Sequence, residues 1–268
     1  MTLSRAPARR LTLAAGLLVL TACGQKPGDT RKGGDPGRGD PPAARGPAEV
    51  KTTADALTKD VIADDKAARA KYNGKVVEVE GEVEYANKVI NANGFTMKGA
   101  KKKATDVVGV TVICNVPKGA EGKAWRLGTG QKVKVTGTAT LAALGVYLND
   151  CTVEPLEPAK TPAVSARALA EEVVKDADAA RKKYQGPGGR TEAVIVDGTV
   201  AAVEKDRNGF HTAKLTGSGG VTVDCTVNQE DFAALKVGDA VTIKGDFGGY
   251  YADQKAVVIN TAFVLPKE

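Results

Sequence analysis

The sequence predicts a mainly β protein with helices, built from two tandem five-stranded barrels. β-Branched and charged residues alternate along residues 76–84 with a period of two, which is typical of a strand with one buried face. A second such stretch lies at residues 194–200. Each contains a glycine, Gly81 or Gly198, and a glycine inside a strand usually marks a sharp bend or bulge. The first strand of a small closed barrel needs such a bend, because it runs along two faces of the barrel.

Residues 1–22 have the features of an export signal. Several arginines precede an apolar run at residues 11–20, which is too short to span a bilayer. The run ends in Leu-Thr-Ala-Cys-Gly at residues 20–24, which resembles the lipobox of bacterial lipoproteins. This resemblance implies cleavage before Cys23 and diacylglycerol on its sulfur, so that the membrane becomes a partner. The glycine after Cys23 favours the outer membrane, facing the periplasm; an ordinary signal peptide with a chance cysteine is the alternative.

The lipidated cysteine and a disordered linker are expected over residues 23–50. This segment is rich in Gly, Pro, Asp and Arg and offers almost nothing to bury. As a flexible coil it would span about 30 Å. Two domains follow, at residues 51–160 and 161–268, and each is long enough for a core of its own.

Each domain is expected to open with one helix that lies on its barrel. Leucine, valine, alanine and tyrosine recur at helical spacing on one face: Leu57, Val61, Ala68 and Tyr72 in the first domain, and Leu169, Val173, Ala180 and Tyr184 in the second. Thr53 and Ser165 stand where N-caps belong.

The remaining elements follow in the same order in both domains. Asn-Gly-Phe at residues 93–95 and 208–210 predicts a hairpin turn into the second strand. The other predicted elements are a third strand (110–114 and 221–225), a short helix (119–127 and 229–235), a fourth strand (130–137 and 238–245) and a fifth strand (146–149 and 257–260). Five strands with a helix between the third and the fourth describe an OB-fold. Two Greek-key sandwiches are the rival architecture.

With this order of elements, the chain resembles a family of secreted bacterial OB-fold proteins described as tRNA-anticodon-binding-like. The shared features are Lys-Tyr-x-Gly at residues 71–74, Gly81, Cys114, and Leu-x-x-Gly-x-x-Val-x-x-x-Gly at residues 127–137, with counterparts in the second domain. The resemblance covers both domains and implies two OB-folds. It implies no particular ligand, because the OB-fold hosts many unrelated activities.

Charge and aromatic content argue against nucleic acid as the partner. The first domain has 17 basic and 13 acidic side chains, whereas the second has 13 basic and 15 acidic ones. Aromatic residues make up 4% of the chain, and single-strand binding by OB-folds relies on aromatic stacking and a basic surface. The concentrated basic patch consists of Lys98, Lys101, Lys102 and Lys103. It is either a solvated hairpin tip or a site for an anionic polymer.

Three cysteines follow Cys23. In an exported protein, Cys114 and Cys151 are candidates for a disulfide, because they lie near the ends of the third and fifth strands, which are neighbours in an OB-fold. The second domain keeps Cys225 but has Ala262 in place of the partner. Cys225 is expected to be a small buried side chain, with an intermolecular disulfide as the alternative.

The sequence predicts no catalytic centre, no metal site and no cofactor. The single histidine, His211, has no cluster of metal ligands and no nucleophile motif beside it. Four glutamates alternate on the outward side of the first strand (Glu78, Glu80, Glu82 and Glu84). They lack the spacing of a calcium loop and are expected to form a solvated strand face.

These features predict a non-enzymatic envelope lipoprotein that presents two OB-fold binding modules. Phe247, Tyr250 and Tyr251 stand in the predicted connection between strands four and five, where OB-folds contact ligands. A protein or a glycan is the ligand expected there; a tyrosine that caps the barrel mouth is the alternative. Two other functions stay open, namely binding of single-stranded nucleic acid or another anionic polymer through the first domain, and a structural envelope spacer.

Overall fold

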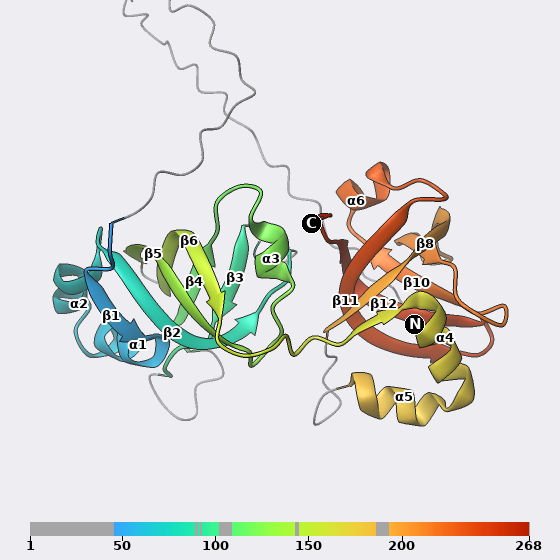
Figure 1. The fold of residues 1–268 in the computed structure, drawn as a ribbon, viewed down its shortest axis with the longest axis horizontal. Helices are drawn as coiled ribbons and strands as arrows, with labels where there is room; N and C mark the ends of the chain where they lie inside the picture. Colours follow the sequence, from blue (N-terminus) through green and yellow to red (C-terminus); the bar gives the residue numbers. More distant parts are fainter. Residues whose placement is uncertain are drawn as a thin grey trace, which may run out of the picture. The chain divides into compact units, whose positions relative to one another are not determined.

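The computed structural model describes residues 46–267, except 89–90, 92, 102–108, 143–144 and 186–192. The predicted signal peptide, Cys23 and nearly all of the predicted linker lie outside the described residues. Among the helices in the described ranges, none combines the length and the apolar character needed to span a bilayer. Within these ranges the chain forms two closed β-barrels in succession (Figure 1).

The first barrel is a five-stranded OB-fold with one added strand. Its elements are β1 (Val50–Thr53), α1 (Ala54–Ala63), α2 (Asp65–Tyr72), β2 (Val76–Tyr85), β3 (Gly94–Met97), β4 (Thr111–Asn115), α3 (Glu121–Trp125), β5 (Lys132–Ala142) and β6 (Gly145–Pro155). The strand order is β1-β2-β3-β4-β6-β5, and β5 pairs back onto β2 to close the barrel. β4 and β6 are parallel neighbours, as the predicted fold requires. The sequence did not predict β1, which runs parallel to the first half of β2.

The second barrel repeats this arrangement. Its elements are β7 (Ala163–Ser165), α4 (Ala166–Lys175), α5 (Ala177–Tyr184), β8 (Ala193–Lys205), β9 (His211–Leu215), β10 (Thr222–Val227), α6 (Gln229–Ala234), β11 (Ala240–Tyr251) and β12 (Ala256–Val264). The order is β11-β12-β10-β9-β8-β7, with β11 closing onto β8. The predicted fold, two tandem five-stranded OB-fold barrels with N-terminal helices, is confirmed.

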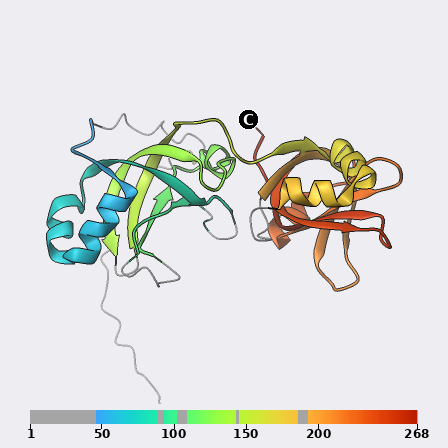
Figure 2. The same ribbon diagram turned by 90° about the horizontal axis from the view of Figure 1, so that it is seen from below.

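Each barrel encloses its own hydrophobic core. Along β2, Val77, Val79 and Val83 are buried, while the intervening glutamates face outward, as the period of two predicts. Leu57 of α1 and Tyr72 of α2 are fully buried in the same core. Figure 2 shows α1 and α2 (blue) at one end of the first barrel, and α4 and α5 (yellow) lying against the second.

The single helix predicted at the start of each domain is two helices. α1 ends and α2 begins at Asp64, whose backbone is extended and whose carboxylate accepts a hydrogen bond from the Ala67 N–H at 3.0 Å. Asp176 separates α4 from α5 in the same way. Aspartate is a strong N-cap, which favours a new helix start over continuation. The predicted N-caps Thr53 and Ser165 are confirmed.

The Lys-Tyr pair that ends each second helix fastens it to the first helix. The Tyr72 hydroxyl donates to the Asp60 carboxylate at 2.6 Å, and Lys71 Nζ lies 2.8 Å from the same oxygen. The hydrogen bonds from Lys71 and Tyr72 lower the pKa of Asp60. The second barrel repeats this arrangement with Tyr184, Lys183 and Glu172. This shared feature is therefore structural, since a buried tyrosine needs a partner for its hydroxyl.

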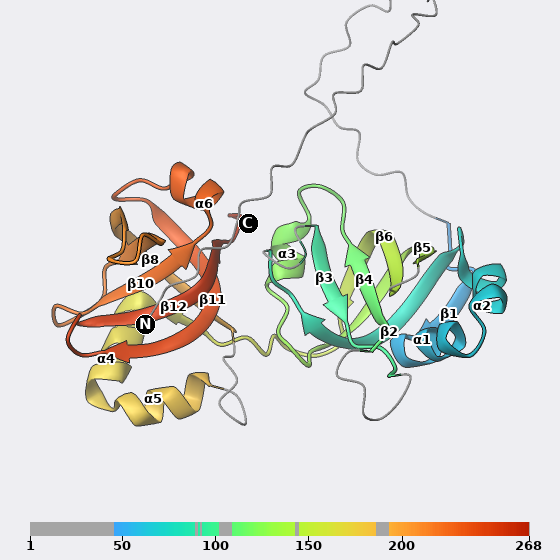
Figure 3. The same cartoon turned by 180° about the vertical axis from the view of Figure 1, so that it is seen from behind.

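Gly81 and Gly198 lie within β2 and β8, but the pairing with β5 and β11 runs through them without a shift in register. The irregularities come later in both strands. A Cβ on Gly81 would lie 2.8 Å from Cβ of Ala54, the first residue of α1, and 2.7 Å from Cε of Met97. The glycine is thus needed because α1 approaches the strand closely. Figure 3 shows β2 as one long strand that curves from β1 toward β3.

The two Asn-Gly turns differ. Gly209 has φ +84° and stands in the turn between β8 and β9, as predicted. Gly94 is the first residue of β3 and is not left-handed; a Cβ there would clash with the carbonyl oxygen of Cys114 on β4. The turn into β3 therefore lies earlier than predicted, closed by the hydrogen bond from the Gly94 N–H to the Asn91 carbonyl at 3.2 Å, and the glycine is needed for close strand contact.

Candidate functional site

The predicted aromatic ligand site does not stand on a loop. Phe247, Tyr250 and Tyr251 all belong to β11, which pairs with β12 as far as Tyr251. Phe247 is 1% exposed and packs on Tyr184, with ring centroids 5.3 Å apart. Tyr250 is half-buried against the same core, and Tyr251 is exposed. The prediction of an aromatic pair on a glycine-flexible loop is therefore wrong.

The glycines beside these aromatics have a structural purpose. A Cβ on Gly248 would lie 2.5 Å from Nδ2 of Asn260, and Gly249 has φ +115°. The β11–β12 register shifts at this point. The glycines thus permit a bulge and a close strand approach, which are the uses of glycine inside a strand.

The predicted basic patch is only partly described. Lys98 and Lys101 are exposed, whereas Lys102 and Lys103 lie outside the described residues. Lys98 follows β3 directly, and its backbone N–H donates to the Glu82 carbonyl at 2.9 Å. Burial raises the pKa of the Glu84 carboxyl, and the positive charges of Lys98 and Lys101 oppose that rise. These lysines thus act on the Glu84 carboxylate of β2, so the surface beside them carries both signs of charge.

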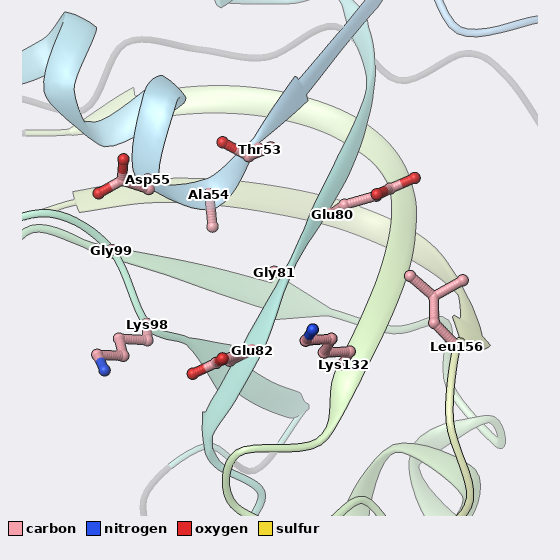
Figure 4. Close-up of a pocket in the computed structure, with 10 residues that line it drawn as sticks. All are labelled: Thr53, Ala54, Asp55, Glu80, Gly81, Glu82, Lys98, Gly99, Lys132 and Leu156. Carbon is pink, nitrogen blue, oxygen red and sulfur yellow. The ribbon is translucent and has the colours of Figure 1, made fainter.

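A groove of about 410 Å³ crosses β2 beside Lys98 (Figure 4). Its floor is the stretch from Glu80 to Glu82. β1 pairs with β2 only as far as Glu80, and the segment after β3 joins β2 at Glu82. On the side of β2 opposite β5, no strand of the described ranges therefore pairs with Gly81. The walls are the start of α1 (Thr53, Ala54 and Asp55), Lys98 and Gly99, Lys132 of β5, and Leu156.

Four of the charged side chains in this groove have no ion-pair partner within the described ranges: Glu80, Glu82, Lys98 and Lys132. Glu82 and Lys132 are direct cross-strand neighbours and still form no ion pair. Similar charges elsewhere in the barrel are paired, as in Lys51–Glu78 at 3.1 Å. Exposed charges without partners keep their hydrogen-bonding capacity for an external group.

The second barrel has the same backbone arrangement with neutral residues at three of these four places, while Asp197 stands at the place of Glu80. Thr199, Thr216 and Ala240 take the places of Glu82, Lys98 and Lys132, as the same backbone hydrogen bond and the same strand register show. The fold itself therefore does not require the charges of Glu82, Lys98 and Lys132. The sequence placed Glu80 and Glu82 on an outward face but did not connect them with Lys98 and Lys132, which lie far away along the chain.

Cys114 and Cys151 lie together in the first core. Both are buried, and the Cys151 thiol donates to the carbonyl of Leu148, the ladder neighbour of Cys114, at 3.1 Å. Burial raises the pKa of Cys114, and the neighbouring thiol raises it further. The two residues are thiols in the structure, so the predicted disulfide is not formed there and stays a prediction. Cys225 is a buried thiol, as expected.

His211 stacks on Phe232, with ring centroids 4.4 Å apart. In the part of the chain that the structure describes, no group of three or more His, Cys, Asp or Glu side chains is placed to hold a metal ion.

A family model described as tRNA_anti-like matches the chain twice, over residues 38–152 and 146–262. The chain belongs to the tRNA_anti-like family. The two matches correspond to the two barrels, so that the recognition from the Lys-Tyr-x-Gly and Gly-x-x-Val-x-x-x-Gly features is confirmed.

One solved structure similar to this chain comes from Klebsiella pneumoniae subsp. pneumoniae MGH 78578 and is described as a candidate nucleic acid-binding lipoprotein. It is 14% identical, covers 41% of this chain and 100% of its own, and superposes with a TM-score of 0.32. No curated protein matches the chain.

Proposed function

We propose that this chain is a non-enzymatic envelope lipoprotein whose first barrel binds a polypeptide in the groove over β2. The observation that carries the proposal is the set of two carboxylates and two ammonium groups that line the groove without ion-pair partners in the described ranges. A polypeptide segment with both signs of charge can pair with all four. Leu156, which is 46% exposed, offers an apolar contact beside them.

Other ligand classes suit this groove less well. Sugar recognition favours aromatic side chains, and none of the described residues that line the groove is aromatic. Lys98 and Lys132 would attract a phosphate backbone, but Glu80 and Glu82 would repel it. Protein partners, by contrast, are selected by charges of both signs placed in complementary positions.

The membrane anchor in this proposal rests on the sequence. The Leu-Thr-Ala-Cys-Gly motif at residues 20–24 supports lipidation of Cys23, and the linker to residue 50 would let the barrels stand clear of the lipid headgroups. The proposed location is the outer membrane, with the barrels facing the periplasm.

The test replaces groove charges by the residues that the second barrel has at the same places. Immobilised residues 24–268 are expected to retain a protein from an envelope extract, identified by mass spectrometry. The variant Glu82→Thr, Lys98→Thr, Lys132→Ala should retain about tenfold less of that protein, because three exposed charge contacts of about 0.5 kcal/mol each amount to about one decade in affinity.

A control removes a charge pair of the same barrel that lies outside the groove, with Lys51→Thr and Glu78→Thr. Equal retention by the groove variant and the control would refute the proposed site. Salt-sensitive retention of a single-stranded oligonucleotide that depends on Lys98 and Lys101 to Lys103 would support the nucleic-acid alternative instead. Loss of envelope integrity without any retained ligand would support a spacer.

A further inference from the structure

Lys244 of β11 is buried, and its side chain donates hydrogen bonds to three backbone carbonyl groups of the other barrel. The side chain is 3% exposed. Its ammonium donates to the carbonyl oxygens of Ala86 at 2.8 Å, Trp125 at 2.7 Å and Leu127 at 2.8 Å. These acceptors follow β2 and end α3, and each proton of the ammonium has one of them. A lysine is almost never buried this deeply unless its side chain has specific partners.

Lys244 is the centre of a row of side chains across three strands of the second barrel. In the strand ladders it pairs with Ile195 of β8 on one side and with Phe263 of β12 on the other. Ile195 is 6% exposed and Phe263 is 0% exposed, although both stand on the outer side of the barrel wall. Apolar residues on an outer strand face require a covering surface.

The first barrel has polar residues in the equivalent row. Glu78 of β2, Thr136 of β5 and Thr152 of β6 are paired across the same three strands. Thr152 is exposed, and Glu78 forms an ion pair with Lys51. The two copies share one backbone plan, so this difference in side chains marks a surface that only the second barrel has.

Other residues near Lys244 also contact the first barrel. The Trp125 ring meets the edge of Phe263 with centroids 5.8 Å apart, and Ile195 and Leu265 complete this buried cluster. At its side, Lys88 of the first barrel lies 3.0 Å from the carboxylate of Asp231. The surface thus combines an apolar patch, a coordinated ammonium and an ion pair, which is the composition of a specific protein interface.

We propose that the outer face of β8, β11 and β12 is a dedicated docking surface for the first barrel of the same chain, with Lys244 as its specificity-determining residue. The three carbonyl acceptors, the Trp125 ring and Lys88 all belong to that barrel, which identifies the occupant. The two barrels therefore behave as one rigid body, and this face is closed to other ligands.

The test uses residues 24–268, which contain both barrels complete, and compares Lys244→Met with Thr136→Met at the equivalent position of the first barrel. Methionine keeps much of the length but donates no hydrogen bond, so that the three carbonyls lose their partner. Wild type and Thr136→Met should show one rotational correlation time and one cooperative unfolding transition. Lys244→Met should show a correlation time close to that of a single barrel and two unfolding transitions.

A second variant keeps the test decisive if Lys244→Met unfolds the second barrel. Lys88→Met removes the ion pair from the first barrel and leaves Asp231 with its hydrogen bonds to Asn228 and Val264, so that it should move the correlation time toward that of a single barrel; an unchanged correlation time would contradict the docking. Independent tumbling of the two barrels in the wild-type chain would overturn the proposal, and so would a Lys244→Met variant that stays one body. A concentration-dependent dimer in light scattering would overturn the choice of occupant, because the first barrel of a second copy would then be docked.

Discussion

At the scale of single residues, Gly81 lets both α1 and the Met97 side chain pack closely against β2. The pairing of β2 with β5 continues through it, so the residue is not a bulge. It is a glycine because the first turn of α1 and the Met97 side chain occupy the space where a Cβ would stand. On the side of β2 opposite β5, this close approach leaves Gly81 unpaired by any strand of the described ranges. Gly81 there forms part of the floor of the groove.

Replacing Gly81 by alanine should destabilise the first barrel by about 1–3 kcal/mol, the usual cost of forcing an extra carbon into a packed site. Met97 can turn aside, but Ala54 begins a helix that is fixed by its N-cap. Gly46→Ala is the control, because nothing lies within 4 Å of a Cβ there. Urea unfolding of both variants measures the difference; equal stability would show that α1 moves freely away from β2.

At the scale of elements, the parallel pair β4 and β6 brings together two cysteines that are distant in the sequence. Cys114 lies beside Leu148 in the ladder, and the Cys151 thiol reaches the Leu148 carbonyl at 3.1 Å. The second barrel keeps the pair of strands but has Ala262 at the second position. The pairing of thiols is thus a feature of the first barrel alone.

In protein purified from an oxidising compartment, Cys114 and Cys151 should be joined by a disulfide. The bond would close a loop of about 36 residues and contribute about 3–4 kcal/mol in the chain-entropy model. Titration of denatured residues 24–268 with a thiol reagent should then find a single reactive thiol, that of Cys225. Three reactive thiols in protein from the same compartment would contradict this expectation.

At the scale of the whole molecule, the two copies of one fold have diverged in their outer surfaces. The first barrel carries the charged groove, where the second has Thr199, Thr216 and Ala240. The second barrel carries the buried row around Lys244, where the first has polar residues. Duplication therefore separates the proposed binding face from the proposed docking face, and the shared core leaves both surfaces free to differ.

The docking of the barrels should make stability depend on pH through Lys244. Burial lowers the pKa of this lysine from 10.5 to about 7, and Asp246 on the same strand opposes the fall. Between these two values the unfolded chain binds a proton that the folded chain does not, so that folding becomes more favourable as pH rises from about 7 toward 10.5. Below pH 7 both states are protonated and this contribution is constant.

The measurement is the free energy of unfolding of the wild type minus that of Lys244→Met, determined in urea between pH 6 and 10. The subtraction removes the titration of groups away from the interface, whose surroundings are the same in both proteins. The difference should rise with pH above about 7. A difference that is constant across this range would mean that the three carbonyl oxygens keep the ammonium charged in the folded state.

The sequence by itself determined the repeat, the order of strands and helices, the outward glutamates and the N-caps. These features depend on the period of two in strands, on helical spacing and on capping chemistry, which act between residues close together in the chain. For the same reason, predictions from local sequence were wrong where a glycine is needed for contact with residues distant in the chain. Gly248 and Gly249 suggested a loop, but they fit β11 against β12.

Only the tertiary structure decided the groove and the docking face. Glu82, Lys98 and Lys132 line the same groove because strand pairing in the closed barrel brings distant parts of the chain together. No local sequence pattern encodes this pairing. In the sequence, nothing distinguishes Lys244 from an ordinary lysine on a strand. Only the fold places three carbonyl oxygens of the other barrel around it. Every residue type has a backbone carbonyl, so the sequence does not show which carbonyls act as acceptors. Whether a charged side chain is buried depends on the surface that packs over it.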